Sequence, residues 1–129
     1  MATGQRILIV EDNSVISNLL THLLERRGYE VQLASDGRAA KDFIDTAEPP
    51  HLVVLDVILT HFDGFQLIEE MRSRDKWKDI PVIMLTSKNR EIDIVRALNA
   101  GADDYMTKPF RPEELLARVQ RSIKHAENN

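Results

Sequence analysis

The sequence predicts an α/β protein in which five strands alternate with five helices, forming one parallel sheet with helices on both faces. Five short apolar runs recur along the chain, and three of them are apolar on both sides. Such runs are typical of strands buried in a parallel sheet. Patterns of helical period lie between the runs. Because the alternation occurs five times, we expect a (βα)5 arrangement in three layers.

The first half of the chain holds three apolar runs, which are ILIV at 7–10, VQLA at 31–34 and LVVL at 52–55. After the first run, apolar residues follow the spacing of a helix: Ile16, Leu19, Leu20, Leu23 and Leu24. Gly28 then stands where a helix C-cap glycine belongs. The second helical pattern contains Ala39, Ala40, Phe43 and Ile44. The segment EPPH at 48–51 predicts a loop.

The second half holds the other two runs, VIML at 82–85 and YM at 105–106. The helical pattern before the first of these contains Phe65, Leu67, Ile68 and Met71, and KWKDIP at 76–81 predicts a loop. The next helix is expected to pack through Ile92, Val95 and Leu98, and to stop at Gly101. The last helix is expected to open with Pro112 and to pack through Leu115, Leu116, Val119 and Ile123.

Composition and charge limit the functions open to the chain. Its 129 residues suit one domain, and they are 43% hydrophobic and 29% charged, with a net charge of −4. Without a basic excess, direct nucleic-acid binding is not expected. The absence of cysteine excludes disulfides and thiolate sites, and fits a reducing compartment such as the cytoplasm. We expect neither a signal peptide nor a membrane helix, because no apolar stretch approaches ~20 residues.

Polar residues gather at the carboxyl ends of the predicted strands. Glu11 and Asp12 follow the first strand, Asp56 closes the third, Thr86 the fourth and Lys108 the fifth. Open α/β sheets bind ligands beyond this edge. Each residue also has an ordinary explanation, since acidic residues cap helices, threonine suits strands and lysine is commonly solvated. The presence of all five at one edge favours a functional site.

The chemistry of these residues points to a cation and a phosphoryl group. Three carboxylates at one edge repel by roughly 4 kcal/mol per pair at about 4 Å and an effective dielectric of about 20. Such a site must bind protons or a cation, and a few oxygen ligands with room for water suit Mg²⁺ or Mn²⁺. Lys108 adds an ammonium and Thr86 a hydroxyl, which completes a receptor for a phosphoryl dianion. Asp56, inside an apolar run, is placed to be the nucleophile that accepts phosphate.

Five motifs carry a resemblance to a known family. ILIVEDN, VVLDVIL followed by DG, VIMLTS, GADDYMTKPF and PEELLARV occur in this order, and with them the chain resembles the receiver domain of two-component response regulators. The resemblance covers residues 6–124 and implies a single receiver domain over 1–129. It also implies a flavodoxin-like sheet of strand order 2-1-3-4-5.

The resemblance implies roles for the acidic residues. Asp56 would accept phosphate from a phosphohistidine, carried by a sensor histidine kinase or a histidine phosphotransfer protein. Glu11 and Asp12 match the acidic metal pair of the family, with Asp12 as the more direct ligand. The backbone carbonyl of Ile58 would complete the protein ligands of the metal ion.

The resemblance also implies a switch. Thr86 and Tyr105 match the switch pair of the family, and Lys108 matches its phosphate-binding lysine. The bond between Lys108 and Pro109 is expected to be cis. Phosphorylation would draw the Thr86 hydroxyl inward and let Tyr105 turn in, which biases a two-state surface built by the fourth helix, fifth strand and fifth helix.

Some positions tune or depart from the family pattern. Ile58 and Lys88 lie two residues after the acceptor and the switch threonine, where side chains of the family set the lifetime of the phosphoryl group. Thr60 stands where the family often has proline, and His61 follows it. The conformation of the loop at 57–63 is therefore left open by the sequence.

Three rival functions use similar features. An aspartate-based phosphatase or dehalogenase needs a second acid two residues after its nucleophile, where this chain has Ile58. A flavodoxin needs a phosphate loop rich in serine, threonine and glycine after the first strand, where this chain has the acidic EDNS. A degenerate receiver would serve only as an interaction module, and the complete residue set argues against it.

The output of the switch is the last expectation from the sequence. The output domain would be covalently attached beyond Asn129 or belong to another protein. Charged residues on the switch surface suggest a weak, salt-sensitive two-fold dimer, although solvated charges explain them at least as well. These residues are Asp103, Asp104, Arg96, Arg118 and Arg121.

Overall fold

A computed structural model gives the structure of the chain and describes residues 2–128. It contains one parallel sheet with the strand order β2-β1-β3-β4-β5, which confirms the expected order. The strands are β1 (Arg6–Val10), β2 (Glu30–Ala34), β3 (Leu52–Leu55), β4 (Val82–Thr86) and β5 (Asp104–Thr107). The helices are α1 (Ser14–Arg26), α2 (Gly37–Thr46), α3 (Gly64–Arg72), α4 (Glu91–Ala100) and α5 (Pro112–Glu127).

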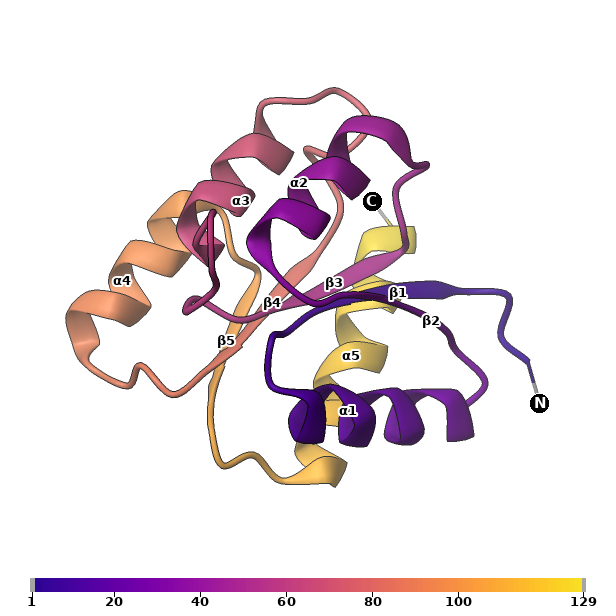
Figure 1. Cartoon of the computed structure of the whole chain (residues 1–129). Coiled ribbons are helices and arrows are strands. Elements are labelled where there is room, and N and C mark those ends of the chain that lie inside the picture. Colours follow the sequence, from indigo (N-terminus) through magenta and orange to yellow (C-terminus); the bar gives the residue numbers. More distant parts are fainter. Residues whose placement is uncertain (1, 129) are drawn as a thin grey trace.

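The helices cover both faces of the sheet. Helices α1 and α5 lie on one face, and α2, α3 and α4 lie on the other (Figure 1). Alternate residues of β1 therefore enter different cores: Leu8 and Val10 pack on the side of α2 and α3, and Ile7 and Ile9 on the side of α1 and α5. This two-sided burial explains why the central strands are apolar on both sides.

Helix ends follow from local sequence signals. The Asn13 side chain caps the first turn of α1, and Asp63 forms a capping box with Gln66 at the start of α3. Pro112 occupies the first turn of α5, as predicted. Gly101 ends α4 in the left-handed region at φ 111°, also as predicted. These signals mark where α1, α3 and α5 begin and where α4 ends.

The sequence predicts a loop at 76–81, and this prediction holds only in part. The segment forms turns between α3 and β4, but Trp77 is 2% exposed and belongs to the core. Its ring meets the ring of Phe43 edge-on, with centroids 6.1 Å apart. The side chain of Trp77 in this turn therefore completes the core beside α2 and α3.

The predicted packing face of α4 is wrong. Ile92, Val95 and Leu98 are 67%, 46% and 49% exposed, and Ala97 is the residue of this helix that is fully buried. Because Ala97 has a small side chain, α4 can lie close to its neighbours on one side while its larger apolar residues face outward. These three large side chains therefore contribute little to the core. Among the described helices, none is long and apolar enough to cross a bilayer.

Candidate functional site at the carboxyl edge of the sheet

The parallel sheet brings the predicted polar residues to one edge. Glu11 directly follows β1, Asp56 follows β3, and Lys108 follows β5. The register pairs Val10 with Leu55, so the residues after them lie side by side. Three segments that are far apart in the sequence therefore meet in one place.

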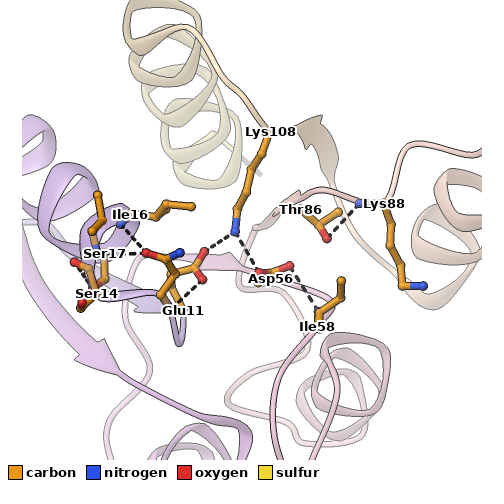
Figure 2. A network of polar contacts seen from close by, with 11 residues as sticks. Glu11, Ser14, Ile16, Ser17, Asp56, Ile58, Thr86, Lys88 and Lys108 are labelled. Atoms are coloured by element: carbon orange, nitrogen blue, oxygen red, sulfur yellow. Dashed lines mark hydrogen bonds and ion pairs between the residues drawn. The ribbon is translucent and has the colours of Figure 1, made fainter.

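Lys108 is the centre of the site. Its ammonium lies 2.6 Å from an oxygen of Glu11 and 2.9 Å from Oδ2 of Asp56, and Figure 2 shows it reaching down between them. Burial by itself lowers the pKa of Lys108, but the hydrogen bonds to Glu11 and Asp56 outweigh burial and raise it. Lys108 is thereby held as a cation against the acceptor.

Both oxygens of Glu11 have partners. One accepts from Lys108, and the other accepts from the backbone N–H of Asn13 at 3.1 Å. Burial nevertheless raises the pKa of Glu11 above its ordinary value, because Glu11 is only 3% exposed and Asp56 adds a like charge. The carboxylate of Glu11 is thus held in place at an electrostatic cost.

Asp56 is held from two sides. Lys108 binds Oδ2, and the backbone N–H of Ile58 donates to Oδ1 at 3.2 Å (Figure 2). The residue is buried, with 6% of its surface exposed. These two bonds fix the plane of the carboxylate at the end of an apolar strand.

The three acids fit a divalent cation. Glu11, Asp12 and Asp56 each offer a carboxylate oxygen, and these atoms lie within 4.8 Å of one another. Glu11 and Asp56 share the single ammonium of Lys108 and Asp12 adds a third acid, so acids outnumber the one lysine in this group. Asp12 is exposed while Glu11 is buried, which leaves Asp12 free to meet an ion from solvent. Hard oxygen donors of this kind suit Mg²⁺.

The predicted switch residues meet at Lys88. Thr86 is fully buried, and its Oγ1 accepts from the backbone N–H of Lys88 at 3.4 Å. The Tyr105 hydroxyl donates to the backbone carbonyl of Lys88 at 2.5 Å. Burial, with Asp93 and Asp56 nearby, raises the pKa of Tyr105 to about 12. The ring of Tyr105 is therefore already anchored to the segment that leads into α4.

The side chains of Lys88 and Ile58 lie near the site without joining its polar contacts, which these two residues make through their backbone N–H groups. The Lys88 side chain extends away from Asp56 in Figure 2. Ile58 is 51% exposed, at the mouth of the site. The peptide bond between Lys108 and Pro109 is cis. The sequence reasoning missed the role of Asn13, although asparagine before a helical pattern is an N-cap signal.

The predicted charges of the output surface are paired within the chain. Asp104 binds Arg118 at 2.6 Å and Arg121 at 3.3 Å. Asp103 binds Arg72 at 3.1 Å and also accepts from the N–H of Val82. The guanidinium of Arg96 lies 4.1 Å above the ring of Phe65 instead. Fewer charges are therefore left for a second copy than the sequence suggests.

Comparisons with known proteins identify the family of the chain. The family model of the response regulator receiver domain matches residues 7–120. The chain is 45% identical over 124 residues to the alkaline phosphatase synthesis transcriptional regulatory protein PhoP of Bacillus subtilis, covering 96% of the chain and 50% of that protein. It is 42% identical over 121 residues to the regulatory protein VanRc of Enterococcus gallinarum, covering 94% and 51%. The chain thus spans about half the length of these curated relatives.

Solved structures give the same result. A CheY-like receiver domain protein of Methanospirillum hungatei is 31% identical, with a TM-score of 0.89 and coverage of 96% of this chain and 97% of that chain. The receiver domain of a sensor histidine kinase from Pseudomonas aeruginosa, solved with magnesium coordinated in its active site cleft, is 34% identical. Its TM-score is 0.85, and the coverage is 95% of this chain and 99% of that chain.

Proposed function

The chain belongs to the family of response regulator receiver domains, and we propose that it acts in a phosphorelay by accepting a phosphoryl group on Asp56. The donor is a phosphohistidine on a sensor histidine kinase or a histidine phosphotransfer protein in the cytoplasm. The chain is a switch in this proposal and not a turnover enzyme. Its chemistry is confined to phosphotransfer onto itself and slow loss of the phosphate.

One observation carries the proposal: Asp56 is a buried carboxylate held by Lys108 and by the N–H of Ile58, with two further acids beside it. In the transfer, a carboxylate oxygen of Asp56 attacks phosphorus. The P–N bond of the phosphohistidine breaks, and the imidazole leaves with the electron pair. Lys108 then faces the transferred phosphoryl oxygens, where its positive charge offsets the negative charge that they bring.

A divalent cation, Mg²⁺ or Mn²⁺, completes the proposed site. Glu11, Asp12 and Asp56 would hold it, and the backbone carbonyl of Ile58 would add a ligand. When bound, the ion supplies positive charge to the phosphoryl oxygens in the transition state. Because Glu11 already binds Lys108 and Asn13, Asp12 is the better candidate for direct contact.

The signal leaves the site through Thr86 and Tyr105. A phosphoryl group on Asp56 offers an acceptor to the Thr86 hydroxyl, which at present accepts from Lys88. Both Thr86 and Tyr105 bind the backbone of Lys88, just before α4. We therefore expect the start of α4 to respond first, and with it the surface of α4, β5 and α5. The partner on this surface is an output domain, attached or separate, or a second copy of the chain.

A rival proposal is an aspartate-based phosphatase. Such an enzyme needs an acid two residues after its nucleophile, where this chain has Ile58 with an exposed apolar side chain. A degenerate receiver, the second rival, has no need for the bonds that hold Asp56 and Lys108. Turnover of a phosphorylated substrate would favour the first rival, and absence of phosphorylation would favour the second.

The test is phosphorylation by a small donor. With acetyl phosphate and Mg²⁺, intact mass spectrometry is expected to find one phosphate, stable to acid and labile to base. EDTA or Asp56→Asn should abolish it, while Asp45→Asn, which removes an acid near the end of α2 that pairs with Lys41 and Arg74, should leave it unchanged. Equal labelling of the Asp56→Asn variant would reject Asp56 as the acceptor.

A further inference from the structure

The loop after Asp56 also holds the side chain of Asp56. The N–H of Ile58 donates to Oδ1 of Asp56 at 3.2 Å, and the N–H of Gly64 donates to the carbonyl of Val57 at 2.9 Å. The position of the loop at 57–63 therefore sets the direction of the acceptor carboxylate. Whatever holds this loop also orients Asp56.

A contact from α2 holds the middle of this loop. Gly37, the first residue of α2, donates its N–H to the carbonyl of Thr60 at 3.0 Å. A Cβ at position 37 would overlap the carbonyl oxygen of Phe62 and lie 2.7 Å from that of Thr60. Both obstacles are backbone atoms, so they could yield only if the whole loop moved. Glycine is required here by close approach, and its φ lies outside the positive range.

The loop is shaped to make this contact. The carbonyl of Thr60 accepts from Phe62 as well as from Gly37, both at 3.0 Å. His61, between them, has φ 73°, a left-handed conformation that is strained for a residue with a side chain. The tight turn at His61 aims the Thr60 carbonyl at the start of α2. The strained backbone at His61 thus accompanies a contact with α2, a segment distant in the sequence.

A second glycine, at the start of α3, packs against the beginning of the loop. A Cβ at Gly64 would overlap the backbone carbonyl oxygen of Asp56 and lie 2.9 Å from Cα of Val57. The start of α3 is consequently in direct contact with the backbone of the acceptor. Gly64 therefore packs against the loop where it leaves Asp56, and Gly37 packs against its middle.

We propose that Gly37 is a positioning residue for Asp56, acting through the loop at 57–63. This inference rests on the proposed function of Asp56 as phosphoacceptor. Gly37 is not a member of the acid cluster, and the atoms nearest to a Cβ built there belong to Thr60 and Phe62. Its lack of a side chain lets α2 clamp the loop, and the loop in turn presents the N–H of Ile58 to the acceptor carboxylate.

The decisive variant is Gly37→Ala. We expect it to slow phosphorylation by acetyl phosphate at saturating Mg²⁺ by about tenfold or more, since small displacements of reacting groups have effects of this size. Amide hydrogen exchange should also become faster at Ile58 and Gly64, while the buried β3 amide of Val54 keeps its wild-type rate. This local loss of protection separates positioning from general destabilisation.

Ala40→Gly is the matched control, because it weakens the same helix without adding an atom against the loop. It is expected to lower Tm while leaving the phosphorylation rate and the exchange at Ile58 unchanged. If Gly37→Ala does not fold, His61→Pro disrupts the same turn without altering α2, and should slow phosphorylation severalfold. This direction is expected because proline holds φ at about −65° and cannot adopt the φ of 73° that the turn requires.

The outcomes are distinguishable. A wild-type chain that takes no phosphate on Asp56 rejects the proposed function itself. A wild-type chain that is phosphorylated, with a folded Gly37→Ala variant that reacts at the same rate, rejects only the role of Gly37. Equal slowing by Gly37→Ala and Ala40→Gly would also reject it, because the effect would then be one of stability.

Discussion

Two clusters of charged side chains show how the same residue types serve different ends. The site cluster consists of Glu11, Asp12, Asp56 and Lys108, with one cation against three acids. A surface ring joins α2 to the end of α3 through two acids and two bases. The ring consists of Lys41, Asp45, Glu70 and Arg74, with contacts of 2.8, 2.5, 2.9 and 3.9 Å.

Charge balance and burial separate the two clusters. In the site cluster, the paired side chains of Glu11, Asp56 and Lys108 are 3–14% exposed, and negative charge is in excess. In the ring, charges balance and the side chains are 22–38% exposed. Because the ring is balanced and partly exposed, its ion pairs link two helices but contribute little to the free energy of folding. A buried, unbalanced cluster is costly to keep and is suited to bind a cation and a phosphoryl group.

Removing one lysine from each cluster should show the largest difference. Lys108→Met is expected to slow phosphorylation of Asp56 by about a hundredfold or more, the usual cost of losing a fixed charge at developing negative charge. Lys41→Met should leave the rate unchanged. The comparison is made with acetyl phosphate and Mg²⁺, following intact mass over time. Equal rates for the two variants would show that the site lysine has no special role.

Removing acids should separate them by their contact with metal. Glu11→Ala is expected to weaken Mg²⁺ binding about tenfold. Asp12→Ala is expected to weaken Mg²⁺ binding more. The reason is that Glu11 already spends both oxygens on Lys108 and Asn13. Titration calorimetry measures both, with Asp45→Ala from the ring as the control. The reverse order would make Glu11 the direct ligand.

The lifetime of the phosphate depends on the mouth of the site. Ile58 is branched and apolar, so it screens the path of water and cannot orient it. Wild-type dephosphorylation should be slow, and Ile58→Asn should speed it severalfold. Val95→Asn, which replaces another exposed apolar residue on α4, serves as control. An unchanged rate in Ile58→Asn, with a wild-type half-life of seconds, would contradict this.

The two clusters should respond to pH with opposite signs. Burial raises the pKa of Glu11, so its stabilisation is complete below the ordinary value of 4.5 and is lost as pH rises through the raised pKa. The hydrogen bond from Lys41, with help from Arg74, lowers the pKa of Asp45, so its stabilisation is lost as pH falls below 3.8.

Denaturation in EDTA at several pH values checks these signs. Glu11→Gln should flatten the loss of unfolding free energy above pH 4.5. Asp45→Asn should flatten only the loss below pH 3.8. If Glu11→Gln leaves the profile unchanged, the carboxylate of Glu11 is not strained by burial.

The smallest effect is expected for self-association through α4, β5 and α5. The beryllofluoride mimic of phosphorylation should raise dimerisation at low salt, and Arg118→Glu should weaken it. The effect is small because Arg118 already binds Asp104 within the chain, and an exposed pair contributes only about 0–1 kcal/mol. Sedimentation with and without the mimic measures it. A strict monomer in both states would favour a different partner.

The packing of single helices was harder to predict than the sheet. Strands β1, β3 and β4 are buried on both faces, so apart from Arg6 at the start of β1 and Thr86 at the end of β4 their residues are apolar, and the sequence shows these runs directly. The spacing of Ile92, Val95 and Leu98 places them on one face of a helix, but it does not show whether that face is buried. In α4 this stripe faces solvent. The burial of Trp77 was equally hard to predict, because its turn enters the core through a contact with Phe43 that is distant in the sequence.

By itself, the sequence determined the order of elements, the strand positions and the residues at the carboxyl edge, because periodicity and strand ends are local properties. Only the tertiary structure decided that Lys108 bridges Glu11 and Asp56, and that Gly37 meets the carbonyl of Thr60. These contacts join segments that a parallel sheet brings together through crossover helices. Their geometry follows from how the layers pack, and no local pattern encodes it.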